Sequence, residues 1–145
     1  MFRKFGLHAA LIISCLVIIF FPMLREKPDA EKAEKAMAAA TQFLTLVDTA
    51  QYDVSWQEGA ELLKEKITQD EWVEKLKNIN SLYGPLVERK HEKSTYTISA
   101  KDSPDGEYII LIYETNFKNK ASTTETVIAT LEKDNFWRVA GYHIR

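Results

Sequence analysis

The chain has 145 residues, of which 46% are hydrophobic and 28% charged, and this composition indicates one globular domain and excludes a disordered chain. The formal net charge is −2, but the first 24 residues contain Arg3 and Lys4 and no acid, which leaves 17 bases and 21 acids, or −4, for the rest. An acidic domain lacks the basic face that nucleic acids require, so no nucleic-acid partner is expected. Because Cys15 is the only cysteine, the folded part has no disulfide, thiolate metal site or cysteine nucleophile.

The N-terminal segment from Phe5 to Leu24 is almost entirely apolar and is 20 residues long. As a helix it would extend about 30 Å, which matches the hydrocarbon core of a bilayer. Arg3 and Lys4 precede it, so the positive-inside rule predicts a cytoplasmic N-terminus and a membrane contact through this segment. We therefore interpret residues 1–28 as a signal anchor with a short linker, and residues 29–145 as an extracytoplasmic, periplasmic domain.

Two other fates of this segment stay open. A cleaved signal peptide would make the domain secreted, although no small-x-small site ends the apolar run before Arg25. A lipoprotein signal would anchor the chain through a lipid at Cys15, because Ile12 to Cys15 resembles a lipobox, although the apolar run continues past the cysteine. The retained anchor fits both observations and is the interpretation that we favour.

Three amphipathic helices are expected after the linker. Asp29 is a suitable N-cap for the first, whose apolar residues recur at helical spacing to about Asp48. A second, shorter helix is predicted to begin near Asp53. Its inner face would contain Trp56, Ala60 and Leu63.

The third helix has the clearest boundaries in the chain. Thr68 and Glu71 have the spacing of a capping box, in which each side chain accepts a backbone N–H of the other residue. Gly84 and Pro85 then end the helix, because glycine is favoured just after a helix and proline cannot continue it. These residues have structural explanations and need no functional one.

The remaining sequence predicts strands. Leu86 to Ala100 reads as an extended strand that is partly an edge, and charged side chains protect it from unwanted pairing. These charges are Glu88, Arg89, Lys90, Glu92 and Lys93. A turn at Ser103–Gly106 leads into three more strands, so we predict an α+β fold of three helices on a curved, cone-like, four-stranded antiparallel sheet.

The register of the last two strands depends on their loop. A two-residue turn at Asp134-Asn135 is expected because both residues tolerate positive φ angles. It would pair Val127 with Tyr142 and Leu131 with Arg138.

The preceding hairpin is expected to have an even-length loop centred on Asn119-Lys120. This loop would pair Ile112 with Val127 and Glu114 with Glu125. One face of the sheet would then contain Tyr108, Ile110, Ile112, Glu114, Glu125, Val127, Ala129, Leu131, Phe136, Ala140, Tyr142 and Ile144. The other would contain Ile109, Leu111, Tyr113, Phe117, Ile128, Trp137, Val139 and His143.

Three helices can cover only one of these apolar faces. The second face is therefore expected to meet a second subunit, as in a homodimer, or another envelope protein, because exposed aromatic area is otherwise a liability. Tyr113, Phe117 and Trp137 lie on that face and are the candidate binding residues.

Several sequence blocks occur in the order found in one bacterial family. They are Phe43-Leu44, Asp48, Tyr52, Trp56, Glu71-Trp72, Tyr83-Gly84, Pro104–Tyr108, Phe117–Lys120, Glu125–Val127 and Trp137–Tyr142. Over about residues 35–145 the chain resembles the family called domain of unknown function 4019. The resemblance implies a secreted or envelope-attached protein and supplies no catalytic residue. More loosely, the element order is similar to the cone fold of nuclear transport factor 2 (NTF2-like) and ketosteroid isomerase, and fold alone does not define function.

One constellation has chemical potential. Glu114 opposite Glu125, with Tyr142 on the same face, would favour a shared proton, because like charges repel across a strand pair and burial disfavours ionisation. Such a pair could perform general acid–base catalysis. Alternatively, both carboxylates lie at the solvated sheet end and are neutralised by Arg145, Lys118 or Lys120.

Other catalytic signatures are absent from the sequence. It has no glycine-rich phosphate loop, no paired histidines at metal spacing and no G-x-S-x-G, so no metal or cofactor is expected. The sequence therefore favours a non-catalytic module of the cell envelope that binds a ligand or a protein. The alternative is a small acid–base enzyme, isomerase- or hydrolase-like, with the carboxylate pair in a cone cavity.

Overall fold

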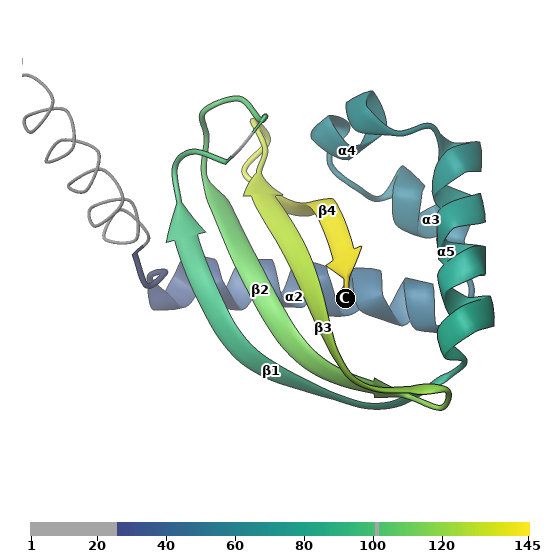
Figure 1. Ribbon diagram of the computed structural model, residues 1–145. Coiled ribbons are helices and arrows are strands. Elements are labelled where there is room, and N and C mark those ends of the chain that lie inside the picture. Colours follow the sequence, from purple (N-terminus) through teal and green to yellow (C-terminus); the bar gives the residue numbers. More distant parts are fainter. Residues whose placement is uncertain (1–25, 101) are drawn as a thin grey trace, which may run out of the picture.

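The computed structural model describes residues 26–100 and 102–145, which form an α+β fold. Its helices are α2 (Ala30–Asp48), α3 (Tyr52–Gln57), α4 (Glu61–Lys66) and α5 (Gln69–Tyr83). Its strands are β1 (Leu86–Thr97), β2 (Tyr108–Phe117), β3 (Lys120–Leu131) and β4 (Trp137–Ile144). In Figure 1 the curved sheet lies in front of α2, and α3, α4 and α5 stand beside β4.

The predicted membrane segment, residues 5–24, lies outside the described residues. Among the residues that the structure does describe, no helix is both long and apolar enough to cross a membrane.

The predicted helix boundaries are confirmed for α2 and α5. Asp29 caps α2 by accepting the backbone N–H of Glu31 at 3.0 Å. Both halves of the capping box between Thr68 and Glu71 are present at the start of α5. Gly84 follows α5 with a φ angle of 74°, a left-handed conformation that glycine adopts without steric cost.

The predicted second helix is instead two short helices, α3 and α4. The break falls at Gly59 and Ala60, where the N–H of Ala60 donates to the carbonyl of Val139 on β4 at 2.9 Å. A Cβ on Gly59 would lie 2.7 Å from the Leu63 side chain and 3.3 Å from the Val139 carbonyl oxygen. This close approach to β4 takes the backbone out of helical geometry, so the described chain has four helices where we expected three.

The four strands form an antiparallel meander in the order β1-β2-β3-β4. At the outer edge of β1, Glu26 exchanges two backbone hydrogen bonds with Tyr96, of 2.7 and 3.1 Å. The residues just before α2 are therefore held against the β1 edge.

The predicted pairing of β2 with β3 is wrong by one residue. Glu114 lies opposite Thr124, and Glu125 lies opposite Tyr113. Because side chains alternate between the faces of a strand, this shift exchanges the two faces of β2 relative to the prediction.

A bulge near the hairpin explains the difference. Phe117 pairs with Lys120 around a two-residue turn, and Ser122 then adopts a φ angle of 55°. The Asn116 side chain accepts the N–H of Ser122 at 2.7 Å and stabilises this geometry. The extra residue in β3 shifts every later β2–β3 pair by one residue.

The predicted pairing of β3 with β4 is confirmed in part. Val127 pairs with Tyr142 as expected, but Leu131 pairs with Trp137 and not with Arg138. The loop is one residue longer than predicted, with Asn135 at a φ angle of 66°, and a bulge at Ala140 restores the expected register.

The helices cover what we call the inner face of the sheet. The Phe43 ring of α2 lies 5.6 Å from the Tyr142 ring on β4 and 6.0 Å from the Trp72 ring on α5. The buried core also includes Ala36, Ala40, Leu44, Leu76, Ile109, Leu111, Tyr113, Val127, Ala129 and Val139. Ile110, Ile112 and Ile128 are half-buried and lie on the opposite, outer face.

Candidate functional site

A buried polar cluster joins α2 to three strands under the inner face. Arg89 of β1 donates to both carboxylate oxygens of Asp48 at 2.6 and 2.9 Å, and to Glu125 of β3 at 3.1–3.2 Å. The Tyr142 hydroxyl of β4 donates to Glu125 Oε2 at 3.0 Å. We call Asp48, Arg89, Glu125 and Tyr142 the Arg89 cluster.

Burial makes the charges of this cluster mutually dependent. The Glu125 side chain is 0% exposed, that of Arg89 12% and that of Asp48 22%. Burial alone would lower the pKa of Arg89, but the hydrogen bonds and charges of Asp48 and Glu125 outweigh it and raise that pKa. Burial first, and the adjacent Glu125 charge second, raise the pKa of Tyr142 well above its ordinary value.

This arrangement is unsuited to the predicted acid–base chemistry. Glu114 is exposed on the outer face, so it does not share a site with Glu125. Both Glu125 oxygens already accept hydrogen bonds from Arg89 or Tyr142. The cavity bordered by Asp48, Tyr52 and Tyr142 has only about 80 Å³, far below the roughly 300–1,000 Å³ of sites that enclose ligands.

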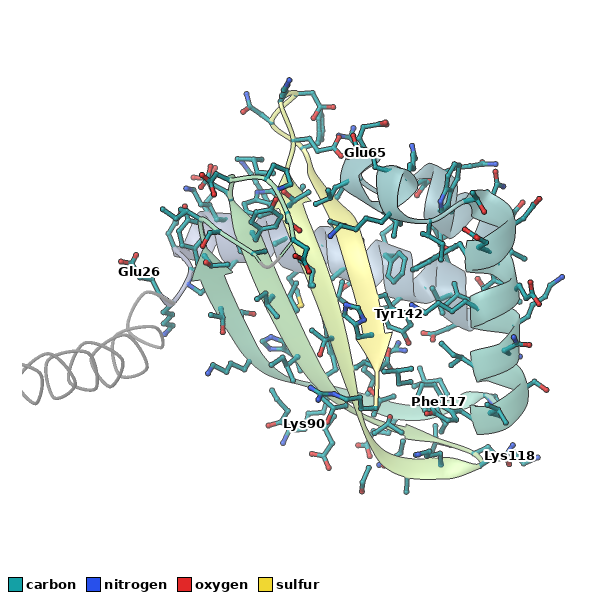
Figure 2. The ribbon with its side chains drawn as sticks, turned by 45° about the horizontal axis from the view of Figure 1, so that its top comes forward. Glu26, Glu65, Lys90, Phe117, Lys118 and Tyr142 are labelled. Atoms are coloured by element: carbon teal, nitrogen blue, oxygen red, sulfur yellow. The ribbon has the colours of Figure 1, made fainter. Side chains whose placement is uncertain are left out.

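The other predicted site residues occupy different places. Tyr113 and Trp137 are buried in the core, and burial raises the pKa of the Tyr113 phenol to about 12. Phe117, which is labelled in Figure 2, is half-buried, and its ring lies 5.7 Å from that of Tyr83. Of the predicted residues, Glu125 and Tyr142 share a hydrogen bond, and Tyr113 lies opposite Glu125 across the β2–β3 pair. Figure 2 shows Tyr142 between β4 and the helices.

A larger groove opens on the other side of β4. It has about 790 Å³ and is bordered by α4 and α5, by the outer face of the sheet, and by the loop after β1. Ile110 and Ile128 belong to its floor, and Leu62 and Ile67 to its helical wall. Ser99 contributes from the loop. We call this space the outer groove.

Among the described residues that border the outer groove, the charged ones are Lys66 and Lys75, and His143 lies beside them. Lys66 Nζ donates to the Ser103 hydroxyl at 3.0 Å, and Lys75 Nζ donates to the Tyr142 carbonyl at 3.3 Å. Burial lowers the pKa of Lys75. Partial burial and then the charges of Lys75, Lys66 and Arg145 lower the pKa of His143.

A second large groove, of about 1190 Å³, lies between α2 and β1. Its border carries charges of both signs. The acidic residues are Glu26, Glu34 and Glu92, and the basic ones are Lys27 and Lys93. The described border of this groove is therefore mixed in charge. Among the residues that the structure describes, no three His, Cys, Asp or Glu side chains are grouped so that they could hold a metal ion.

Sequence reasoning missed the most informative residues of both sites. Arg89 was assigned to edge protection, although Glu125 on a largely apolar strand face was a signal that a buried cation was needed. Lys66 and Lys75 carried no signal, because lysines on amphipathic helices are ordinarily solvated.

The chain belongs to the family described as protein of unknown function (DUF4019), whose family model matches residues 39–142. This confirms the family resemblance. No curated protein and no solved structure matches the chain. The similarity to the nuclear transport factor 2 cone accordingly stays a prediction.

Proposed function

We propose that the domain is a non-catalytic module that binds a small, largely apolar ligand in the outer groove. The groove carries this proposal, since its volume of about 790 Å³ falls within the roughly 300–1,000 Å³ typical of ligand sites. Its border combines apolar side chains with a few polar groups, which is the usual composition of such sites.

The location of the module is also a proposal. The apolar run of residues 5–24 and the basic residues before it support a signal anchor that holds the domain outside the cytoplasmic membrane. A ligand or protein partner would then be one of the cell envelope.

Methyl NMR can test the site without depending on the N-terminal segment. The full chain, labelled at isoleucine δ1 methyl groups and held in phospholipid nanodiscs, is titrated with three probes that share one alkyl chain: octanoate, octanamide and octylammonium. At least one probe should shift the Ile110 and Ile128 signals, which border the groove, and leave Ile112 and Ile109 in place. Equal shifts at all four, or none from any probe, would refute the proposal.

A pair of matched variants tests the same point. Ile110→Trp places a large side chain in the groove floor, whereas Ile112→Trp makes the same change two residues along the outer face and outside the groove border. Ile110→Trp should abolish the shift of Ile128, and Ile112→Trp should preserve it. The wild-type titration decides the question if Ile110→Trp fails to fold.

A further inference from the structure

We infer that the ligand of the outer groove is an amphipathic anion, namely a single-chain carboxylate whose apolar body lies along Ile110 and Ile128 and whose head group binds Lys66 and Lys75. This inference rests on the proposed function, because it names the class of molecule that the same groove would take.

The first reason is that the two lysines take part in no ion pair within the described residues. The hydrogen-bond partners of Lys66 and Lys75 are a hydroxyl and a carbonyl. Some other cations of the described domain are paired, as Lys32 is with Glu107, and exposed lysines such as Lys77 are not, but Lys66 and Lys75 border the same groove. A carboxylate in the groove would supply the missing charge.

The second reason is the position of Lys75 on an apolar wall. Its ammonium group lies 5.4 Å from the centre of the Trp72 ring, and the residue is only partly exposed. A cation that has lost part of its hydration gains more from an added anion than a fully solvated one does, because the effective dielectric constant is lower. Burial lowers the pKa of this lysine, and a bound anion would reverse that effect.

The third reason is that the groove border has a cationic part and an apolar part, which come from different elements. Lys66, Lys75 and His143 come from α4, α5 and β4, whereas Ile110 and Ile128 come from the two central strands. A ligand that satisfies both parts needs one anionic head and an apolar tail. Inorganic anions would leave the floor uncovered, and a neutral hydrocarbon would leave the lysines without a partner.

The three probes of the NMR titration test the class of the ligand separately from the proposal that the groove binds a ligand. Octanoate and octanamide are nearly equal in shape and differ in charge, and octylammonium reverses the sign. Octanoate should bind at least tenfold more tightly than octanamide, because its carboxylate forms charge-assisted hydrogen bonds with the lysines. A tenfold difference in affinity corresponds to about 1.4 kcal/mol of binding free energy. Octylammonium should bind most weakly of the three. Free probe concentrations are measured by dialysis, because each probe enters the nanodisc differently.

Two outcomes distinguish the failures. If octanamide binds the groove as tightly as octanoate, the anion class is wrong although the groove binds ligands. If no probe shifts Ile110 or Ile128, the proposed function itself fails, and the ligand class fails with it.

Lysine variants assign the head-group site. Lys75→Gln and Lys66→Gln should each weaken octanoate about tenfold and leave octanamide unchanged. Lys77→Gln is the matched control, because Lys77 is exposed on the same helix and does not border the groove. Equal weakening of octanoate and octanamide would indicate a loss of groove shape and would contradict the assigned head-group contact.

Discussion

In the Arg89 cluster a guanidinium contacts two carboxylates beneath the sheet, whereas in the outer groove the hydrogen bonds of two ammonium groups go to a hydroxyl and a carbonyl. Tyr142 belongs to both regions. Its hydroxyl donates to Glu125 in the cluster, and its backbone carbonyl accepts from Lys75 on the groove side.

The difference separates charges that hold the fold together from charges available to a ligand. Arg89 joins residues far apart in the chain, and its neutralisation is complete within the protein. Lys66 and Lys75 lie where a solvent-exposed space adjoins them. Removal of a cation should therefore destabilise the fold in the first region and leave it nearly unchanged in the second.

Arg89→Met should give the largest effect. It leaves the fully buried Glu125 carboxylate without a cation, and breaking a buried ion pair in this way costs about 3–5 kcal/mol of unfolding free energy. Chemical denaturation measures the loss. Arg138→Met is the matched control, because Arg138 pairs with Glu132 and Asp134 near the surface and should lose no more than about 1 kcal/mol.

The double variant Arg89→Met with Glu125→Gln sharpens this test. A neutral amide has no uncompensated charge, so the double variant should be more stable than Arg89→Met alone. If the two are equally unstable, packing and not charge explains the loss.

Tyr142→Phe should have a smaller effect. It removes one hydrogen bond to the Glu125 carboxylate and keeps the ring that packs on Phe43. A hydrogen bond to a charged group contributes about 1.5–3 kcal/mol, and the unfolding free energy should fall by that amount. An unchanged denaturation midpoint would show that Arg89 alone satisfies the carboxylate.

Lys75→Met should change the unfolding free energy by no more than about 0.5 kcal/mol, because methionine keeps the apolar contact with Trp72 and has similar helix propensity. The same denaturation experiment checks it. A loss comparable to that of Arg89→Met would mean that the two regions do not differ as described.

The smallest effect concerns the titration of His143. Its folded-state pKa should lie below the ordinary 6.5, because partial burial and, to a lesser extent, the neighbouring cations disfavour the charged imidazolium. The unfolded chain therefore binds this proton first as the pH falls below 6.5, so the contribution of His143 to stability is present above that pH and declines below it.

NMR of the imidazole signals measures that pKa directly. Lys75→Met removes one of the neighbouring positive charges, so it should raise the pKa of His143 toward 6.5. Lys77→Met is the control and should leave it unchanged. A His143 pKa above 6.5 in the wild type would contradict a positive field in the groove.

Local signals predicted much of the fold. The caps at Asp29 and Thr68 and the stop at Gly84 depend on nearest neighbours, and they lie where the sequence indicated. The alternation of apolar residues predicted the strands for the same reason. The division of the second helix was missed because it depends on a contact with Val139, far away in the chain.

The candidate site could be predicted only in part, because one extra residue in a strand changes which side chains point to each face of the sheet. The bulge at Ser122 exchanges the faces of β2, so Tyr113 lies in the core and Glu114 lies in solvent. The contact between Glu125 and Tyr142 could be predicted from the sequence, because no bulge separates the pair Glu125–Ile144 from the pair Val127–Tyr142. The outer groove depends on how α4 and α5 are placed against the sheet, and no local pattern encodes that placement.

The backbone bridge between Glu26 and Tyr96 joins the start of the described chain to the end of β1. Glu26 is paired at the free edge of β1, and Thr97, the residue after its partner Tyr96, borders the outer groove together with the loop that follows. If the proposed anchor holds the chain ahead of Glu26, the loop border of the outer groove would therefore lie beside the point of attachment.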